Sequence, residues 1–462
     1  MDRPEDIIKK LPKSQFSGVF PRLEKMSKAS DRCIIVLDDD PTGCQTLHGI
    51  PVLFRWDLDI LEKEMINGTP LFFLMTNSRS MTEKNAVALY REIGHLIKEA
   101  SEKTGRTFSI ISRSDSTLRG HYPAEPEALQ FLYDQAPVHC IIPAFFQGGR
   151  YTIGDEHYVK TGDLLVPASQ TPFAEDKVFG FTHSNLKKWV GEKTSGRVPG
   201  EQVDSFSIED LRTKGPEFVA QKLQEQEPGA VVAVNAAAQN DLDIFALGAL
   251  KAESQGAILL YRTSASFLNS FGAIQPRKPL EGNEIGSGST KGGLFIVGSY
   301  VPKSTAQLEH LMGQDGIHPI ELEVSRLLQN SSGDYIGESV KQVDQFIEDG
   351  RHVLLYTSRE LVYADDPEEN LAIGKKVSDS LVSICREIRN TPAFIIAKGG
   401  ITSHDIASRG LRIQRAMVAG QALSGVPVLV PDDRPDLKYI VFPGNVGEND
   451  ALSVLFKKIN RT

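Results

Sequence analysis

Residues 113–120 (RSDSTLRG) combine the side chains that a protein needs to bind a small anion carrying several hydroxyl groups. Arg113 and Arg119 can each grip a carboxylate through two parallel hydrogen bonds. The serine and threonine hydroxyls of the same segment can pair with alcohol groups of a ligand. The segment follows the apolar run 107–111, so we expect it where a buried strand ends. An ordinary turn with a solvated Arg–Asp pair would also account for this composition.

Three other polar segments also follow short apolar runs. They are residues 38–43 (DDDPTG), 76–80 (TNSRS) and 144–150 (AFFQGGR). Of the four segments together, three contain an arginine. The adjacent carboxylates of 38–40 repel one another, so a cation, a hydroxyl or backbone donors must offset their charge. A solvated acidic turn is the alternative for that segment.

The spacing of these segments predicts the elements that position them. Helices expected at 82–101 and from about 124 to 133 alternate with the apolar runs. In an open α/β sheet, ligands bind just beyond the carboxyl ends of the strands. The first half is therefore expected to be a doubly wound α/β sheet with its binding site along one edge.

The second half repeats this pattern with glycines at the ends of the apolar runs. Such runs lead into Gly298-Ser299, into 398–402 (KGGIT) and into 443–447 (PGNVG). A helix is expected to begin at Thr402 or Ser403, where backbone N–H groups would form an anion pocket. The sequence contains neither a Walker A loop nor a G-x-G-x-x-G fingerprint. The glycines therefore indicate either nucleotide phosphates or ordinary structural turns.

The composition between the halves indicates a domain boundary. Residues 275–293 are rich in Pro, Gly, Ser and Thr, which is typical of a linker. We predict an N-terminal domain over 1–274 and a C-terminal domain over 294–462. Each is expected to be α/β, with a largely parallel sheet flanked by helices. Residues 1–31 are expected to form a peripheral arm, and 151–215 an excursion over the cleft of the first domain.

Charge and cysteine usage narrow the class of protein. The 462 residues have a formal charge of −9, which argues against a nucleic-acid surface. The four cysteines are far apart and lack C-x-x-C spacing, so buried reduced thiols are favoured over disulfides or a zinc site. No apolar run approaches the length of a membrane span, and the N-terminus lacks the apolar segment of a secretory signal. A cytoplasmic protein without nucleic-acid or membrane partners is expected.

Six of these segments, taken in order, resemble the four-carbon acid sugar kinase family. They are 39–43 (DDPTG), 77–79 (NSR), 115–120 (DSTLRG), 298–299 (GS), 399–402 (GGIT) and the loop 444–447. The resemblance implies an ATP-dependent kinase that phosphorylates a four-carbon sugar acid of the threonate, erythronate or 3-oxo-tetronate type, at its C4 hydroxyl. It also implies an N-terminal sugar-acid-binding domain and a C-terminal nucleotide-binding domain.

The resemblance assigns roles to individual positions. For the sugar acid it implies Asp39, Arg79, Arg113, Ser114, Asp115, Ser116 and Arg119. For ATP it implies Ser299, Gly399, Gly400, Ile401, Thr402 and Gly444. Mg²⁺ would accompany ATP, with ligands that the sequence leaves open. Asp39 and Asp115 are both candidates for the catalytic base that accepts the hydroxyl proton.

Two positions depart from the family pattern and keep other interpretations open. Arg113 stands where the family usually has lysine, and Asp38 with Pro41 gives D-D-D-P-T-G instead of A-D-D-x-T-G. The identity of the sugar acid and its stereochemistry are therefore left open. An NAD-dependent hydroxy-acid oxidoreductase is one alternative, although the dinucleotide fingerprint is missing. A non-catalytic sugar-acid sensor is the other alternative. The sequence also leaves open whether the protein forms a homodimer.

Overall fold

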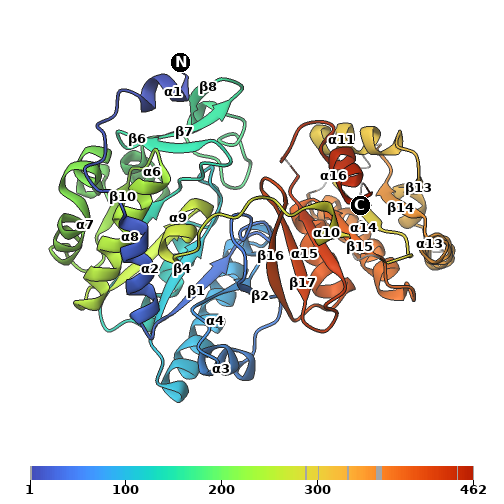
Figure 1. The fold of residues 1–462 in the computed structure, drawn as a ribbon, viewed down its shortest axis with the longest axis horizontal. Coiled ribbons are helices and arrows are strands. Elements are labelled where there is room, and N and C mark those ends of the chain that lie inside the picture. The colour runs from blue at the N-terminus through green and yellow to red at the C-terminus, as the bar shows by residue number, and fades with distance from the viewer. Residues whose placement is uncertain are drawn as a thin grey trace. The chain divides into compact units, whose positions relative to one another are not determined.

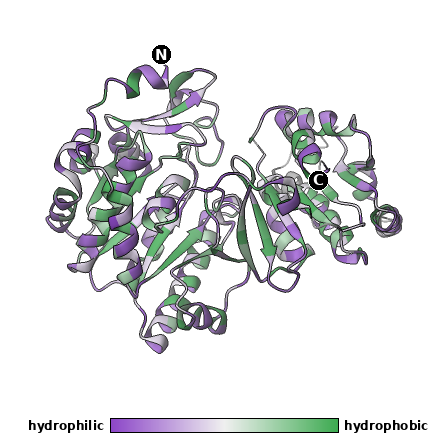
Figure 2. Cartoon of the chain, viewed as in Figure 1, coloured by the Kyte–Doolittle hydropathy of each residue, from purple (hydrophilic) through white to green (hydrophobic). Residues whose placement is uncertain are grey.

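The computed structural model describes residues 3–286, 289–299, 301–329, 332–359, 367–444 and 446–460. The chain forms two compact units (Figure 1). The first unit comprises Met1–Gly43 and Trp56–Pro276, and the second comprises Cys44–Arg55 and Arg277–Thr462. In Figure 2 the strands of the central sheet in each unit are predominantly hydrophobic, whereas most helices carry both hydrophobic and hydrophilic residues.

A parallel sheet forms the centre of the first unit. Its strand order is β3 (Leu71–Met75), β1 (Cys33–Asp38), β4 (Phe108–Arg113), β11 (Leu259–Thr263), β5 (Val138–Ile142), β10 (Val231–Val234) and β9 (Asp204–Phe206). Neighbouring strands all run parallel. Most of these strands are buried along their whole length, as expected for a parallel sheet covered on both faces.

Helices flank this sheet. They are α2 (Val19–Ala29), α3 (Leu58–Ile66), α4 (Glu83–Thr104), α5 (Ala124–Ala128), α7 (Ile208–Gln224), α8 (Gln239–Ser254) and α9 (Ala265–Phe271). The longest of them, α4, begins where the Thr82 side chain accepts a hydrogen bond from the backbone N–H of Asn85. It ends at Gly105, which adopts the left-handed conformation (φ 69°) that favours glycine. Its buried face carries Tyr90 beneath the loops described below.

The N-terminal residues are more than the peripheral arm that the sequence predicts. After α1 (Pro4–Ile8), α2 buries Val19 and Leu23 and packs against α8. These two apolar residues are four apart and so lie on one face of the helix. The segment is therefore part of the helical layer of the first unit.

The excursion expected at 151–215 contains a small antiparallel sheet. Its strands are β6 (Arg150–Ile153), β7 (Glu156–Thr161) and β8 (Leu164–Pro167), followed by α6 (Leu186–Lys193). The ring of Trp189 on α6 stacks on Tyr122, with 4.8 Å between the ring centroids. Leu118 belongs to the same buried cluster, so the excursion packs directly on the loop 113–120.

The sheet of the second unit is parallel in one part and antiparallel in the other. The parallel part is β13 (Ile317–Leu322), β14 (His352–Thr357), β12 (Leu294–Val297), β15 (Phe394–Lys398) and β18 (Lys438–Phe442). The antiparallel part continues through β17 (Val426–Pro431), β16 (Arg415–Leu423) and β2 (Pro51–Leu53). The helices are α10 (Gly282–Ile285), α11 (Pro302–Met312), α12 (Val324–Leu327), α13 (Ser332–Glu348), α14 (Pro367–Glu387), α15 (Gly400–Asp405) and α16 (Ala451–Asn460).

The units differ from the expected boundaries in two places. Residues 44–55 belong to the second unit because β2 pairs with β16 along the antiparallel edge. The described part of 275–293 includes α10, and Leu280 and Ile285 are buried in the core of the second unit. Apolar residues within a Pro- and Gly-rich segment therefore attach it to that core.

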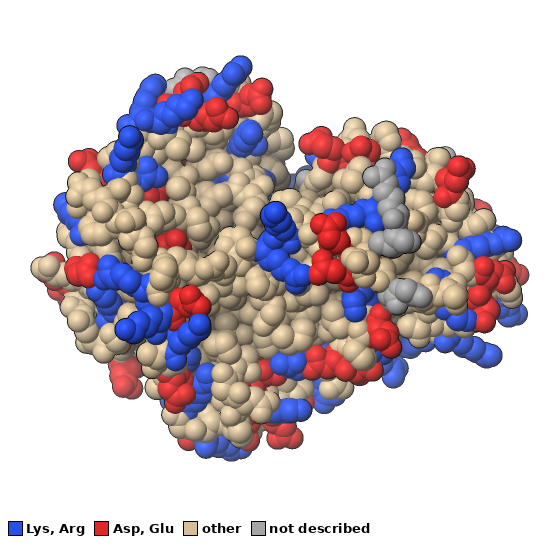
Figure 3. Space-filling model, viewed as in Figure 1, with Lys and Arg blue, Asp and Glu red and all other residues tan. Residues whose placement is uncertain are grey.

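The helix expected to begin at Thr402 or Ser403 begins earlier. Gly399 caps it with a positive φ of 108°, so the first helical residue is Gly400. On the face shown in Figure 3, acidic and basic side chains are interspersed. No helix among the described residues combines the length and the apolar character needed to cross a membrane.

Candidate functional site

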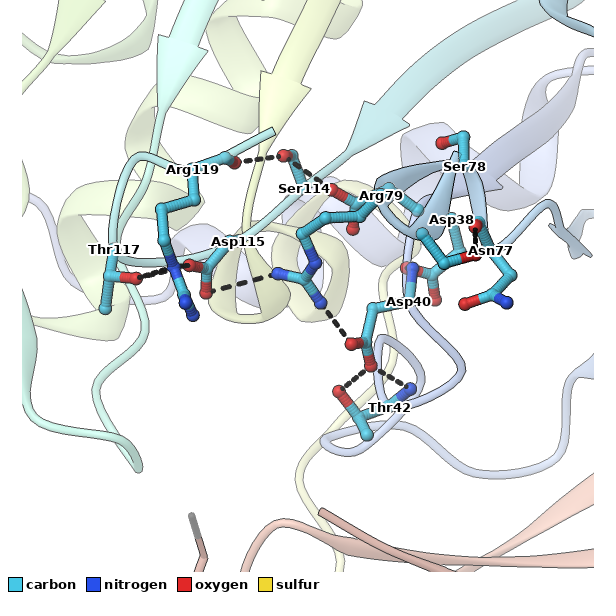
Figure 4. Close-up of polar contacts among 12 residues, drawn as sticks. Asp38, Asp40, Thr42, Asn77, Ser78, Arg79, Ser114, Asp115, Thr117 and Arg119 are labelled. Atoms are coloured by element: carbon cyan, nitrogen blue, oxygen red, sulfur yellow. Dashed lines mark hydrogen bonds and ion pairs between the residues drawn. The ribbon is translucent and has the colours of Figure 1, made fainter. Parts of the chain in front are cut away.

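Loops from three adjacent strands meet at the carboxyl edge of the first unit. Strand β1 lies between β3 and β4, with Asp38 in register with Met75 on one side and Arg113 on the other. The segments 38–43, 76–80 and 113–120 are therefore brought together, as the sequence predicts. Figure 4 shows their side chains converging on one region.

Arg79 and Arg119 link the outer carboxylates of this region into a chain of ion pairs (Figure 4). Arg79 pairs with Asp40, and its Nη1 lies 3.6 Å from Oδ1 of Asp115. The Nε of Arg119 donates to Oδ2 of Asp115 at 2.6 Å. Arg119 also reaches Asp176 of the excursion, with Nη1 3.4 Å from Oδ2. Asp40 additionally accepts from the hydroxyl of Thr42.

A second layer of polar side chains, which is fully buried, lies next to this series of ion pairs. Nη1 of Arg113 is 3.3 Å from Oδ1 of Asp38 and 3.8 Å from Oδ1 of Asp39. The hydroxyl of Ser114 donates to Oδ2 of Asp39 at 2.9 Å. Gly120 has a φ of 119°, and a Cβ there would lie 2.6 Å from the Ser114 hydroxyl, so only glycine fits this approach.

Glu125 and Arg262 form a further buried ion pair that acts electrostatically on Asp39. Glu125 is fully buried and accepts from the Ser78 hydroxyl at 2.5 Å and from Nη1 of Arg262 at 2.6 Å. The same Arg262 nitrogen donates to the hydroxyl of Ser112 at 2.7 Å. A cavity of about 20 Å³ lies beside Arg262, and Ser114, Asp115 and Arg119 are also among its lining residues.

The surroundings divide the carboxylates into two kinds. Burial raises the pKa of Asp38 to about 8, although Arg113 acts in the opposite direction. Burial also raises the pKa of Asp39, against the charges of Arg79, Arg262 and Arg113. For Asp40 and Asp115, burial is outweighed by the neighbouring arginines, which hold their pKa values below the usual range. Two carboxylates are therefore firmly ionised, and two retain a proton more readily.

The structure brings most of the predicted sugar-acid residues into these two layers. Ser116 differs, because its backbone carbonyl contacts Nε2 of His157 at 2.7 Å while its side chain is buried. Sequence analysis assigned no site role to Asp40, Glu125, Arg262 or Arg150. For Arg262 a signal existed, since it lies at the end of an apolar run as Arg79 and Arg113 do.

The glycine-bearing loops of the second unit also meet at one sheet edge. Strands β12, β15 and β18 are neighbours, so Ser299, the 399–402 turn and Gly444 follow adjacent carboxyl ends. Nζ of Lys398, which is fully buried, donates to the carbonyls of Pro443 at 2.8 Å and Gly444 at 3.0 Å. Burial, with a contribution from Lys303, lowers the pKa of Lys398 to about 7.

Close backbone approach explains two glycines of this edge, Gly298 and Gly399. A Cβ on Gly298 would lie 2.6 Å from the Thr402 hydroxyl, and one on Gly399 would lie 3.3 Å from Cβ of Ser299. Gly444 faces open space, and Ile401 is 58% exposed. Tight turns with accessible backbone and a neighbouring lysine fit the phosphates of a nucleotide. Asn445, also in the predicted loop, lies outside the described residues.

Arg359 holds the same edge together and was not expected from the sequence. Its Nη1 donates to the carbonyl of Ser299 at 2.7 Å, and its Nε donates to the carbonyl of Thr357 at 2.9 Å. A cavity of about 280 Å³ in this unit is lined by residues such as Leu294 and Leu437, near the amino ends of their strands. It therefore lies at the opposite edge of the sheet. The described residues contain no cluster of three or more His, Cys, Asp or Glu suited to a metal ion.

Comparison with known proteins places both units in one family. The family model for a sugar-binding N-terminal domain matches residues 34–271, and that for a nucleotide-binding C-terminal domain matches residues 294–452. A D-threonate kinase of Cupriavidus necator is 26% identical over 363 residues, covering 76% of this chain and 79% of its own. A D-erythronate kinase of Heliobacterium modesticaldum is 24% identical over 379 residues, covering 77% and 79%.

A solved structure shows the same fold. A Haemophilus influenzae protein matches with a TM-score of 0.61 at 16% identity, over 92% of this chain and 100% of its own. The two domain matches, in order and over most of the sequence, identify the chain. It belongs to the four-carbon acid sugar kinase family.

Proposed function

We propose that this protein transfers the γ-phosphoryl group of ATP to the C4 hydroxyl of a four-carbon sugar acid of the threonate, erythronate or 3-oxo-tetronate type. The observation that most supports this is the row of arginines, carboxylates and hydroxyls on adjoining strand ends of the first unit. Such a substrate carries one carboxylate and several hydroxyl groups, which these side chains complement. Family membership supports the same reaction class.

Asp39 is the better candidate for the base that accepts the hydroxyl proton. Arg119 and Arg79 outweigh burial and keep the pKa of Asp115 low, so that carboxylate has little tendency to take up a proton. Burial raises the pKa of Asp39, which makes it more basic. Asp115 then orients Arg119 and Arg79 for the sugar acid. This assigns base and positioning roles to the two acids that sequence analysis left unresolved.

The second unit is proposed to hold the nucleotide at the edge formed by Ser299, 399–402 and Gly444. Lys398 and Arg359 shape this edge by donating to its backbone carbonyls. When bound, Mg²⁺·ATP supplies the phosphoryl group and neutralises charge on the phosphate oxygens. The family models support the assignment of sugar and nucleotide to separate domains.

We also propose a cytoplasmic location. The cysteines Cys33, Cys44, Cys140 and Cys385 are buried and form no disulfide. Cysteines that stay as thiols suit a reducing compartment. A homodimer stays a prediction that light scattering of the purified protein would test.

An ADP-release assay with a panel of acids tests the proposed function. The panel contains D-threonate, L-threonate, D-erythronate and 3-oxo-tetronate, with threitol and erythritol as neutral controls. We expect ADP to form with at least one acid, and phosphorus NMR of the product to show a phosphate ester at C4. Lack of ADP formation with every acid would overturn the proposal, and binding without turnover would identify a sensor. Reduction of NAD by a hydroxy acid would instead identify an oxidoreductase.

A further inference from the structure

Arg150 differs from the other arginines around the sugar-acid site. Arg79, Arg113, Arg119 and Arg262 each pair with at least one carboxylate. The Arg150 side chain has no ion pair and no hydrogen bond within the part of the chain that the structure describes, and its Nε is buried without a partner.

The fold directs Arg150 to the same edge as the other arginines. It is the first residue of β6 and closes the loop that follows β5, where its backbone exchanges two hydrogen bonds with Phe145. Its guanidinium carbon lies 5.8 Å from the centroid of the Phe173 ring. The guanidinium carbon of Arg119 lies 5.1 Å from that same centroid. Two arginines thus surround one aromatic ring at the carboxyl edge of the sheet.

Charges of this cluster act on Arg150. Burial lowers its pKa, Asp115 raises it and the charge of Arg119 lowers it further. Because a guanidinium stays charged under all ordinary conditions, Arg150 is a partly desolvated cation that forms no ion pair with a carboxylate of the described residues. Such a group is unfavourable unless an anion binds beside it.

We propose that Arg150 binds the carboxylate of the sugar acid and so makes the site select acids over neutral polyols. This rests on the proposed function, and it adds a residue outside the family motifs quoted above. Arg79 and Arg119 already satisfy carboxylates of the protein, so a substrate carboxylate would have to compete for them. Arg150 offers its donors without that competition. The Phe173 ring lies beside both Arg150 and Arg119, and Nη2 of Arg119, which has no carboxylate partner among the described residues, can complete the clamp.

Steady-state kinetics of Arg150→Met and Arg150→Lys test this inference. We expect Arg150→Met to raise KM for the sugar acid about 10- to 100-fold, the loss typical of a charge-assisted hydrogen bond, with KM for ATP unchanged. The preference for the acid over threitol or erythritol should fall by a similar factor. Arg150→Lys should recover part of this preference, because lysine restores the positive charge but lacks the planar pair of N–H donors that arginine offers a carboxylate.

Two control variants separate binding from packing. Arg197→Met removes an exposed arginine that pairs with Glu127 in the same unit, and it should change neither constant. Phe173→Leu keeps the charges but alters the packing of Arg150, so a small rise in KM is expected. If Arg150→Met raised KM equally for acid and polyol, or left both unchanged, the inference would be overturned.

Calorimetry keeps this inference distinct from the proposed function. Should the wild-type protein show no phosphoryl transfer, titration of D-threonate and D-erythronate into wild type and Arg150→Met still measures the carboxylate contact. Binding by wild type that is lost in Arg150→Met would support the assignment. Equal binding by both proteins, or no binding by wild type, would overturn it.

Discussion

The two proposed substrate edges are built from different parts of the chain. In the first unit, buried charged side chains make the site, and they are joined by ion pairs such as Arg119–Asp115 at 2.6 Å. In the second unit, backbone makes the site, and the cations Lys398 and Arg359 point at main-chain carbonyls. Both lie at the carboxyl ends of parallel strands.

This difference determines which substitutions each edge tolerates. Removing one member of a buried ion pair leaves its partner unpaired, which costs several kcal/mol in typical cases, about 3–5. The first edge should therefore be sensitive to loss of charge. The second edge should be sensitive to an added Cβ, because its turns have positive φ values and close backbone approaches. The predictions below test this contrast, beginning with the largest effect.

Asp39→Asn is expected to lower kcat about 100- to 10,000-fold, because it removes the proposed proton acceptor while retaining its shape. KM for ATP should stay within about twofold of wild type if the nucleotide edge of the second unit binds ATP independently of the sugar-acid site. Steady-state ADP release measures both constants. The matched variant Asp115→Asn should raise KM for the sugar acid more than it lowers kcat. A larger loss of kcat in Asp115→Asn than in Asp39→Asn would reverse the assignment of the base.

Gly399→Ala is expected to raise KM for ATP about 5- to 100-fold. Its φ of 108° is unfavourable for any residue with a Cβ, by about 1–3 kcal/mol, and relaxing it would move the turn at the start of α15. Affinity for the sugar acid should not change. The control is Gly337→Ala in α13, where a Cβ meets open space and the helix should gain slightly in stability. An unchanged ATP constant in Gly399→Ala would argue against this turn as a phosphate site.

The contrast also explains what could be predicted from the sequence. Short apolar runs ending in polar or glycine-rich segments sufficed to predict β1, β3, β4, β5, β12, β15 and β18 and the edge at which their loops meet, whereas the parallel strands β9 and β13 were not predicted. The pairing of Arg262 with Glu125 could not be predicted, because the residues are 137 apart and only the strand order brings them together. The same holds for Asp176 with Arg119 and for β2 with β16. The local sequence pattern predicts helices and strands. The packing of strands and loops across the sheet decides which charged side chains pair with one another.

Lys398 should make ATP affinity depend on pH in a way that the charged network of the first unit does not. With a pKa of about 7, Lys398 is mostly charged at pH 6 and mostly neutral at pH 8.5. Loss of its charge should weaken ATP binding severalfold over this range, and Lys398→Arg should flatten the profile because arginine stays charged. Because the pKa is lowered on folding, this group should also make stability rise with pH between about 7 and 10.5. Calorimetric titrations of ATP at four pH values would test the first effect. Parallel profiles in the two proteins would contradict it.

Asp38→Asn should have the smallest effect on activity, although Asp38 is adjacent to the proposed base. With its pKa raised to about 8, Asp38 is mostly protonated at pH 7, and asparagine is a close neutral substitute that keeps the oxygen facing Arg113. We expect kcat and KM to change less than about twofold at that pH. In contrast, Asp40→Asn removes an ionised partner of Arg79 and should raise KM for the sugar acid.

The pH dependence of stability separates the two neighbouring aspartates. The pKa of Asp38 is higher in the folded protein than its ordinary value of 3.8, so its contribution to stability is complete below about pH 4 and is lost as the pH rises through about 8. Asp38→Asn lacks this titration, so its melting temperature should match wild type at about pH 4 and below, and should exceed it increasingly toward pH 8.5. The pKa of Asp40 is lowered on folding, so its contribution is present at neutral pH and is lost on acidification. Asp40→Asn should therefore melt below wild type at pH 7, with a difference that shrinks toward pH 3. Thermal melts of the three proteins from pH 3 to 9 measure both trends, and the same sign for both variants at every pH would show that burial does not distinguish these carboxylates.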